Sequence, residues 1–191
     1  MHIEAVVIRK IPVREHDQMV VLYTKEMGKL TAIAKGSMRA HSTQALAIDE
    51  GNVIRCELVA GRSGPIMTGA QVVRAFSSAK GTVAGWAAAQ FFLQVVSAAV
   101  YDEQPDAHLW ACICDALHEM DTTPRAELLG AFRRQQAAVL EVLGYGASGE
   151  HTLQSAHAGR SSLDDRFEQI AQRSFSSLDL FYDALRLASL S

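Results

Sequence analysis

The sequence predicts an α+β protein in which a β-rich N-terminal domain precedes an all-helical domain. Two observations support this division. Short β-rich segments separated by turn-forming residues run as far as Phe76, and from Val83 onward apolar residues recur with the 3.6-residue period of helices. The balance of charge changes sign at the same place. Residues 1–80 hold 11 Lys and Arg against 7 Asp and Glu, whereas residues 81–191 hold 7 against 14.

Five strands are expected in the first domain, which we place at residues 1–80. They are EAVVIR (4–9), QMVVLYT (18–24), GKLTAIAK (28–35), NVIRCELV (52–59) and IMTGAQVVRA (66–75). Five strands followed by helices are compatible with a small closed barrel of the OB type. Such barrels bind oligonucleotides on the face of strands 2 and 3 and with the loops that join strands 1 to 2 and 4 to 5.

Five helices are expected in the second domain, residues 81–191. Their periodic segments are 86–101, 106–120, 127–143, 163–172 and 178–190. Pro124 is placed to open the third helix, and Gly144 and Gly146 are placed to end it. Ser162 with Asp165, and Ser176 with Asp179, have the spacing of capping boxes. A loose linker is expected at about residues 145–161.

Composition is typical of a globular protein. Of 191 residues, 49% are hydrophobic and 20% are charged, with only four prolines. The start MHIEAVVIRK lacks the basic region and apolar run of a secretory signal, and residues 83–101 are too polar to span a bilayer. Three cysteines without a signal peptide fit a reducing compartment. The expected localisation is therefore cytoplasmic, without a membrane partner.

Basic residues gather at the positions where an OB barrel contacts nucleic acid. Period-two alternation in the third strand puts Lys29, Thr31, Ile33 and Lys35 on the outer face and the small residues between them inside. Arg14 falls in the first binding loop, Arg62 falls in the second, and Arg39 extends the charge beyond strand 3. Tyr23 is the candidate for base stacking, although a tyrosine at such a place also suits a half-buried core. The surface predicts a polyanion ligand, and the alternative is that the lysines only solvate short strands.

No constellation of residues predicts catalysis, a cofactor or a metal site. Cys112 and Cys114 are two positions apart on an expected helix, so they point about 200° apart and cannot share one ion. They are expected to act as small hydrophobic residues. His151 and His157 lie in the expected linker with no third ligand in view. The protein is therefore predicted not to be an enzyme.

The N-terminal sequence resembles the bacterial recombination mediator family RecO. The run VVIRKIPVREHDQMVVLYTKEMGKLTAIAKGSMR keeps the order and spacing of the family's opening pattern. The elements of that pattern are Arg9, Asp17, Thr24, Gly28, Lys29, Leu30, Ala34, Lys35, Gly36 and Arg39. DAHLWACICDALHEM and ELLGAFRRQQAAVLEVLGYG resemble its helical domain, so the resemblance covers residues 3–146. The family's four-cysteine zinc module and its basic C-terminal ending are not found in this sequence.

The resemblance implies a protein of recombinational repair, associated with the nucleoid. Such a protein binds single-stranded and also double-stranded DNA, promotes strand annealing, and assists RecA loading together with RecR. The C-terminal tail of single-strand-binding protein is a further implied partner. In the family an Arg-rich helix helps to form the pocket for this acidic tail, and Arg133 and Arg134 match that helix. The alternative for both arginines is that they solvate the helix exterior or pair with nearby acids.

Two other functions remain compatible with the sequence. The acidic helical half and the short C-terminal region would suit an interaction adaptor of the repair machinery with little DNA affinity of its own. An OB-fold RNA-binding protein is the second alternative. A protein distinguishes RNA from DNA through the 2′-hydroxyl, and no residue in the sequence indicates whether that group is recognised.

Overall fold

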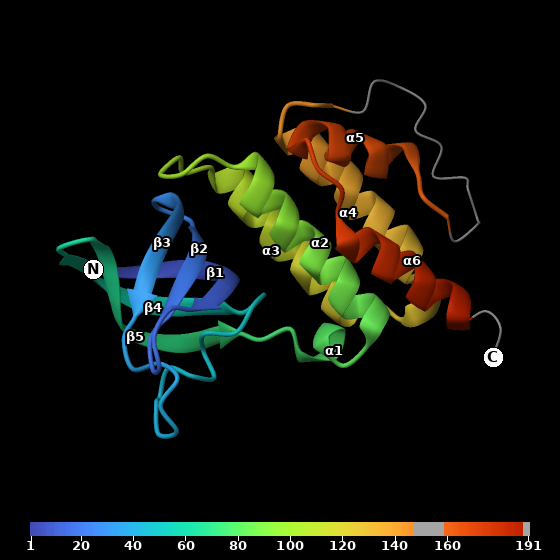
Figure 1. Cartoon of the computed structure of the whole chain (residues 1–191). Helices are drawn as coiled ribbons and strands as arrows, with labels where there is room; N and C mark the ends of the chain where they lie inside the picture. The colour runs from blue at the N-terminus through green and yellow to red at the C-terminus, as the bar shows by residue number, and fades with distance from the viewer. Residues whose placement is uncertain (147–158, 189–191) are drawn as a thin grey trace. The chain divides into compact units, whose positions relative to one another are not determined.

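Five strands precede a set of helices in the computed structural model, which describes residues 1–146 and 159–188. Figure 1 shows the elements coloured along the chain. The strands are β1 (His2–Pro12), β2 (Gln18–Thr24), β3 (Gly28–Ala34), β4 (Val53–Gly61) and β5 (Gly64–Arg74). The helices are α1 (Ser77–Lys80), α2 (Val83–Ala99), α3 (Ala107–Thr122), α4 (Leu128–Val142), α5 (Ser162–Ala171) and α6 (Ser176–Ala188), with a 3-10 turn at Arg125–Glu127.

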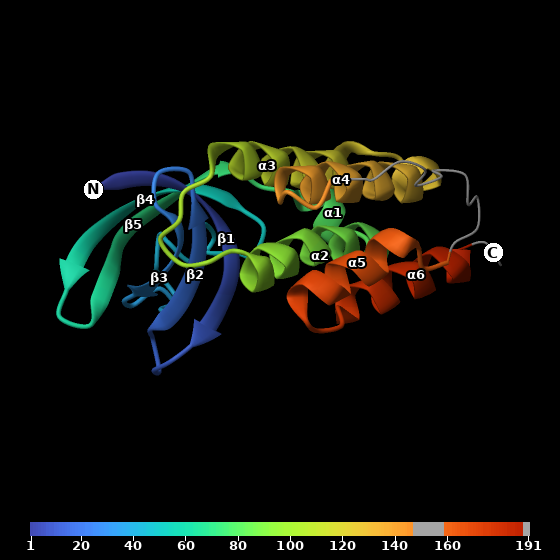
Figure 2. The same cartoon turned by 90° about the horizontal axis from the view of Figure 1, so that it is seen from above.

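The five strands close into a barrel in the order β1-β2-β3-β5-β4. Every pair of neighbours is antiparallel except β3 and β5, which pair in parallel at Ile33 with Ile66 and at Ala34 with Met67. Figure 2 shows the curled strands from above. This arrangement confirms the predicted OB-type barrel and the α+β class.

Alternation along the strands places small side chains inside the barrel. In β3, Leu30, Ala32 and Ala34 are buried, whereas Thr31 and Lys35 are exposed. A narrow barrel of five strands has little interior volume, so alanine at these positions allows the opposite strands to pack. The predicted direction of the outer face of β3 is confirmed.

The chain forms two compact units, and we describe each by itself. The first contains Met1–Ala75 and Val100–Trp110, and the second contains Phe76–Ala99 and the residues from Ala111 onward. The sequence predicts one boundary, at residue 80. The difference arises because the segment after α2 returns to β3, where Glu103 donates its backbone N–H to Lys29 O at 2.9 Å. Residues 147–158 of the expected linker lie outside the described residues.

The predicted helices are present, with ends shifted by a few residues. Two short elements, α1 and the turn at Arg125–Glu127, were not predicted because a single helical turn leaves no periodic pattern. The capping box before α5 uses Ser161 and Asp164, one residue earlier than the predicted pair Ser162 and Asp165. Both Ser-x-x-Asp frames occur in SSLDD, and the buried position of Asp164 selects between them.

Gly144 ends α4 as predicted. Its φ is 82°, a left-handed conformation that residues with a Cβ rarely adopt. The Gly144 N–H donates to Glu141 O at 3.0 Å and the Tyr145 N–H donates to Leu140 O at 2.9 Å. These two bonds form a Schellman motif, which satisfies carbonyl groups that the helix end would leave open.

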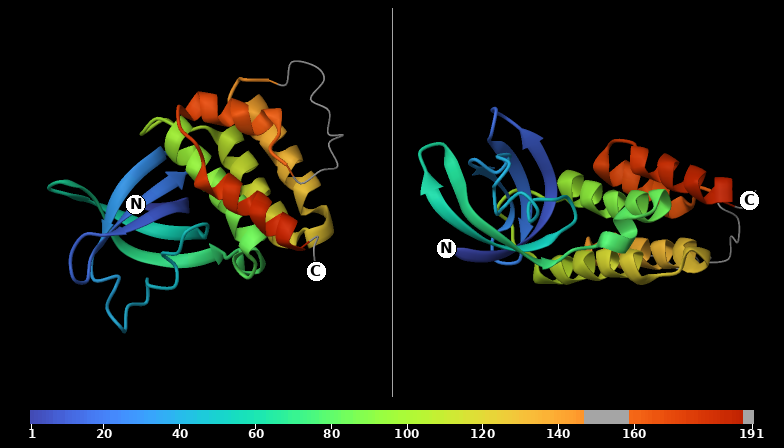
Figure 3. Two further views of the ribbon diagram at one scale, coloured as in Figure 1. Left: turned by 45° about the vertical axis from the view of Figure 1, so that its right-hand side comes forward. Right: turned by 90° about the horizontal axis from the view of Figure 1, so that it is seen from below.

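Aromatic rings fill the core of the helical unit. Phe91 of α2 packs edge-on against Phe92, Phe132, Phe167 and Phe175, with ring centroids 5.0 to 5.3 Å apart. Edge-to-face contacts at this separation are favourable because the positive ring edge meets the negative ring face. Figure 3 shows the same helices from two further directions.

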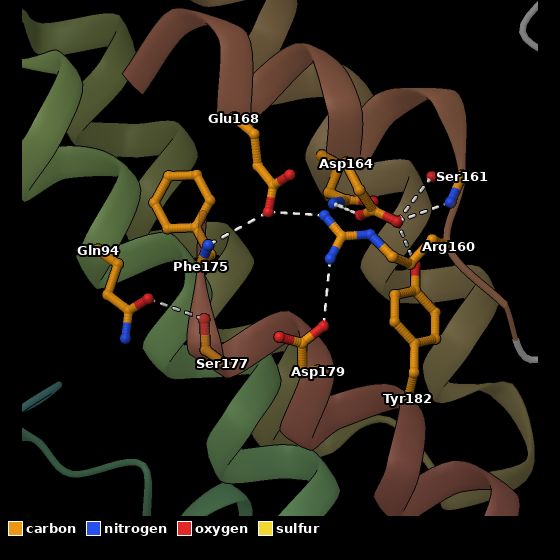
Figure 4. Close-up of polar contacts among 10 residues, drawn as sticks. Gln94, Arg160, Ser161, Asp164, Glu168, Phe175, Ser177, Asp179 and Tyr182 are labelled. Carbon is orange, nitrogen blue, oxygen red and sulfur yellow. Dashed lines mark hydrogen bonds and ion pairs between the residues drawn. The ribbon is translucent and has the colours of Figure 1, made fainter. Parts of the chain in front are cut away.

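Asp164 is the centre of a buried polar network in this unit. Its carboxylate accepts hydrogen bonds from Gln136 Nε2, from Tyr182 Oη and from the Ser161 backbone N–H, each at 2.7 Å. Figure 4 shows Asp164 between Ser161 and Tyr182. Nearby, Arg160 bridges Glu168 at 2.6 Å and Asp179 at 3.1 Å. These contacts connect α4, α5 and α6 to one another.

None of the helices in residues 1–146 and 159–188 is long and apolar enough to cross a membrane.

We predict that Gly28→Ala destabilises the barrel unit. Gly28 has φ 71°, and a Cβ at this position would clash with the backbone of Gln104. Strain in φ and a backbone clash together are expected to lower the free energy of unfolding by about 2 to 4 kcal/mol. The measurement is urea denaturation. Gly69→Ala is the control, because an added Cβ there meets nothing within 4 Å. Similar losses in both variants would contradict the prediction.

We predict that Tyr182→Phe destabilises the helical unit by about 1 to 3 kcal/mol, because a hydrogen bond to a buried carboxylate is lost. The effect depends on pH. Burial and the Asp164 carboxylate raise the pKa of Tyr182 above its usual value. The stabilisation is therefore complete below pH about 10, where unfolded tyrosine is protonated, and is lost as pH rises toward the folded pKa.

Denaturation curves between pH 8 and pH 11 will test this pH dependence. The difference in stability between the parent and Tyr182→Phe should stay constant from pH 8 to about 10 and shrink between about pH 10 and 11. Tyr145→Phe is the matched control, since Tyr145 is exposed. A constant difference across the range would contradict the assigned proton linkage.

Candidate nucleic-acid interface

Three chain segments meet at a groove of about 440 Å³ on the barrel unit, which we call the barrel groove. The β1–β2 loop contributes Arg14 and Asp17, the end of β3 contributes Ile33 and Lys35, and the β4–β5 hairpin contributes Arg62 and Ile66. Arg14, Lys35 and Arg62 were predicted as nucleic-acid contacts from their separate places in the sequence. The groove brings these three cations together.

The cations of the barrel groove are available to a ligand. In the described part of the chain, neither Lys35 nor Arg62 forms an ion pair. Arg14 Nη1 lies 3.9 Å from Asp17 Oδ2, and the Arg14 side chain is 78% exposed. An exposed pair at this length contributes little stability, so a phosphate can compete for the guanidinium.

The floor of the groove is aliphatic. Ile33 and Ile66 are cross-strand partners in the parallel pair of β3 and β5, and Val13 from the first loop also lines the groove. Aliphatic side chains between cations suit a polymer that carries both phosphates and flat apolar faces. Alternation in the third strand predicts that Ile33 lies on the outer face, but it does not predict a function for it. Ile66 was missed because the β3–β5 pairing joins residues 33 positions apart.

Tyr23 does not offer a ring for base stacking, which corrects the prediction. Its side chain is 0% exposed, and its ring lies against Trp110 with centroids 6.0 Å apart. Its hydroxyl donates to Asp106 O at 3.4 Å. The covering residues belong to the segment Val100–Trp110, which is distant in sequence, so the strand pattern around Tyr23 could not indicate it. The alternative interpretation, a core tyrosine, is the one that the structure supports.

Lys29 is also covered by this segment. Its side chain is 16% exposed, and its Nζ lies 3.3 Å from Asp102 Oδ1. The ammonium group is thus already matched with a carboxylate. Lys29 does point to the outer face of β3, as predicted, but it lies outside the barrel groove.

Arg39 lies in the loop that follows Lys35 and does not line the groove. Its side chain is next to Gly36, where a Cβ would lie 3.5 Å from Arg39 Nε. The Arg39 backbone N–H donates to Gly36 O at 3.2 Å, which closes the turn. Arg39 is exposed and forms no ion pair within the described residues, so it remains a candidate contact beside the groove.

Asp17 lines the groove and is an element of the family pattern, but the sequence alone does not predict a role for it. Its Oδ1 accepts the Gly36 backbone N–H at 2.8 Å, and its own carbonyl accepts the N–H groups of Val13 and Arg14 at 3.0 and 3.2 Å. An aspartate a few residues after a strand is a common loop-forming residue. That signal was available in the sequence, but its partner across the loop was not.

The helical unit does not present Arg133 and Arg134 as one surface, which corrects that prediction. Arg133 is 5% exposed and donates from Nη2 to Gly159 O at 3.1 Å. Arg134 points outward and pairs with Glu119 Oε1 at 2.5 Å. Adjacent residues on a helix differ by about 100° in direction, so one side chain enters the core while the other leaves it. The acid that pairs with Arg134 is Glu119 of α3, so the alternative of pairing with an acid holds for Arg134.

Cys112 and Cys114 are half-buried, which corrects the prediction that they are buried small hydrophobic residues, and Cys56 is buried. Burial raises the pKa of the Cys56 thiol to about 11 and also raises the pKa of Cys112, so both stay protonated at neutral pH. Among the described residues, no three His, Cys, Asp or Glu side chains are grouped to hold a metal ion. His151 and His157 lie outside those residues.

The closed β1-β2-β3-β5-β4 barrel with a cationic groove places the N-terminal unit in the class of OB-fold domains. Comparison with known families gives the particular family. Residues 1–76 match the family described as Recombination protein O N terminal. The barrel domain belongs to this RecO N-terminal family, and the match covers all five strands.

The chain is similar to curated proteins named DNA repair protein RecO. The protein from Symbiobacterium thermophilum is 28% identical over 147 residues, which are 75% of this chain and 56% of that protein. The Nostoc sp. protein is 29% identical over 68% of this chain and 44% of its own length. The protein from Anaeromyxobacter sp. strain K is 31% identical over 67% and 54%. The aligned part of the chain thus spans about half the length of these relatives.

We predict opposite consequences for two adjacent substitutions on α4. Arg133→Ala should lower the free energy of unfolding by about 2 to 4 kcal/mol, because it removes a buried guanidinium together with its hydrogen bond and packing. Arg134→Ala should cost less than about 1 kcal/mol, because its ion pair is exposed. Thermal and urea denaturation will compare the two variants. Equal losses would show that the two side chains share one environment.

Proposed function

We propose that the barrel groove binds the backbone of single-stranded DNA and that the chain acts in recombinational DNA repair. The observation that carries the proposal is the convergence of Arg14, Lys35 and Arg62 on one groove. Each cation comes from a different loop or strand end, and these are the loops that OB barrels use for oligonucleotides. The RecO relatives, which are named DNA repair proteins, support DNA as the polyanion.

The mechanism is electrostatic. The cations neutralise phosphates and release the counterions that surround a nucleic acid. The aliphatic floor formed by Ile33 and Ile66 can receive the apolar face of an unpaired base. A bound strand with neutralised phosphates repels a complementary strand less, and on this basis we propose that the protein promotes annealing. No covalent step is required, and the protein is proposed to be a mediator rather than an enzyme.

The proposed setting includes RecA loading together with RecR, with duplex DNA and the C-terminal tail of single-strand-binding protein as further ligands. The tail would require an apolar slot and a cation. The helical unit has a hollow of about 410 Å³ lined by Val83, Leu180 and Leu187, beside Arg125. Asp183 also lines this hollow and balances the charge of Arg125. The hollow therefore suits an acidic tail less well than one with an isolated arginine would.

One observation favours the alternative of an adaptor with little DNA affinity. Tyr23 and Lys29, two of the six expected contacts, are covered by the segment Val100–Trp110. The remaining contacts are Arg14, Lys35, Arg62 and the neighbouring Arg39. Four phosphate contacts without a stacking ring would give affinity that depends strongly on salt.

Fluorescence anisotropy with a labelled single strand at several salt concentrations tests the proposal. Four contacts predict a slope of log affinity against log salt of about −3, because each contact contributes about −0.7 on single strands. Lys35→Ala or Arg62→Ala should make the slope shallower by about 0.7 and weaken binding about threefold to tenfold at moderate salt. A labelled RNA strand of the same sequence separates DNA binding from RNA binding.

Arg55→Ala is the matched control for these variants. Arg55 is an exposed barrel arginine that lines a separate hollow with His2 and Gln71. The variant should keep the slope of the parent. A parent without measurable DNA binding would favour the adaptor, and equal losses in Arg55→Ala and Lys35→Ala would remove the barrel groove as the site.

A further inference from the structure

The Asp17 carboxylate lies among the cations of the barrel groove and contacts two of its sides. One oxygen, Oδ1, accepts the backbone N–H of Gly36 at 2.8 Å. The other oxygen, Oδ2, lies 3.9 Å from Arg14 Nη1. The side chain is 19% exposed. The carboxylate therefore contacts the backbone of Gly36 and also lines the groove.

The bond to Gly36 holds the end of β3 against the β1–β2 loop. Gly36 has φ 63°, a conformation in which the chain reverses immediately after Lys35. Close by, the Met38 N–H donates to His16 O at 3.1 Å, which makes a second link between the same two segments. Together these bonds hold the loop that carries Arg14 against the segment that follows Lys35. The Asp17 side chain provides the first of these two links.

The negative charge of Asp17 opposes nucleic-acid binding, whereas its hydrogen bond to Gly36 supports the site. A carboxylate among three cations attracts Arg14 and repels a phosphate that enters the groove. A neutral acceptor of the same shape would hold Gly36 without this repulsion. The hydrogen bond and the charge can therefore be separated by substitution.

We propose that Asp17 is a positioning residue of the barrel groove whose hydrogen bond to Gly36 strengthens nucleic-acid binding while its charge weakens it. The proposal rests on the proposed function, since it assigns a role in the same site. The hydrogen bond to Gly36 holds the two segments that carry Arg14 and Lys35 against each other, and the charge sets a limit on affinity. A moderate affinity suits a protein that must release the strand after annealing.

The test compares Asp17→Asn with Asp17→Ala by anisotropy titration on the full chain with a labelled single strand. Both variants remove the charge, and only asparagine keeps an acceptor oxygen for Gly36. Asp17→Asn should bind about threefold more tightly than the parent, with an unchanged salt slope. Asp17→Ala should bind about tenfold more weakly than Asp17→Asn, with a slope shallower by about 0.7 because one cation is no longer held in place.

Glu15→Gln is the control for charge alone. Glu15 lies in the same loop, is exposed, and does not line the groove. It should increase affinity less than Asp17→Asn does. Thermal midpoints are measured for every variant, so that a loss of folded protein is separated from a loss of binding.

Three outcomes would overturn the inference. Equal binding and equal slopes in the asparagine and alanine variants would show that the bond to Gly36 has no effect on the site. An asparagine variant that binds no better than the parent, or no better than Glu15→Gln, would remove the role of the charge. A parent that binds no strand, or that keeps full binding in Lys35→Ala, would instead refute the proposed function.

Discussion

The parallel pairing of β3 with β5 is the contact on which the barrel and its groove both depend. It consists of two residue pairs, Ile33 with Ile66 and Ala34 with Met67. The inner pair, Ala34 and Met67, is buried in the barrel, while Ile33 and Ile66 form the floor of the groove. Because Lys35 follows this pairing directly and Arg62 precedes it by a few residues, closing the barrel also brings the two cations together.

The sequence could predict those parts of the structure that depend on local patterns, and not those that depend on distant contacts such as the β3–β5 pairing. Alternation along β3 depends on the strand alone, so the inner and outer faces were predicted correctly. Helix existence and the stop at Gly144 are also local properties. The frame of the capping box at Ser161 is not a local property. SSLDD contains two acceptable frames, and only the buried contacts of Asp164 with Gln136 and Tyr182 distinguish them.

The candidate site was predictable in part for a related physical reason. Cations in loops and at strand ends tend to be exposed whatever covers the strands, so Arg14 and Arg62 could be assigned from the order of the strands, and Lys35 from its place at the end of the third strand. Tyr23 and Lys29 lie within the strands, where exposure depends on distant segments. Arg133 shows the same limit on a helix. Its neighbour Arg134 reaches the surface, and composition alone cannot tell which of two adjacent arginines enters the core.

The return of Val100–Trp110 to the barrel unit makes that unit discontinuous in the sequence. During synthesis on a ribosome, the fifth strand is complete at Arg74, but the residues that cover Tyr23 and pair with Lys29 emerge only after α2 has been made. A nascent barrel therefore lacks the cover that Trp110 gives to Tyr23 and the ion pair of Lys29 with Asp102 for the time needed to translate about thirty further residues. An expressed fragment that ends at residue 80 would remain permanently in this state, and its surface would differ from that of the same strands in the full chain.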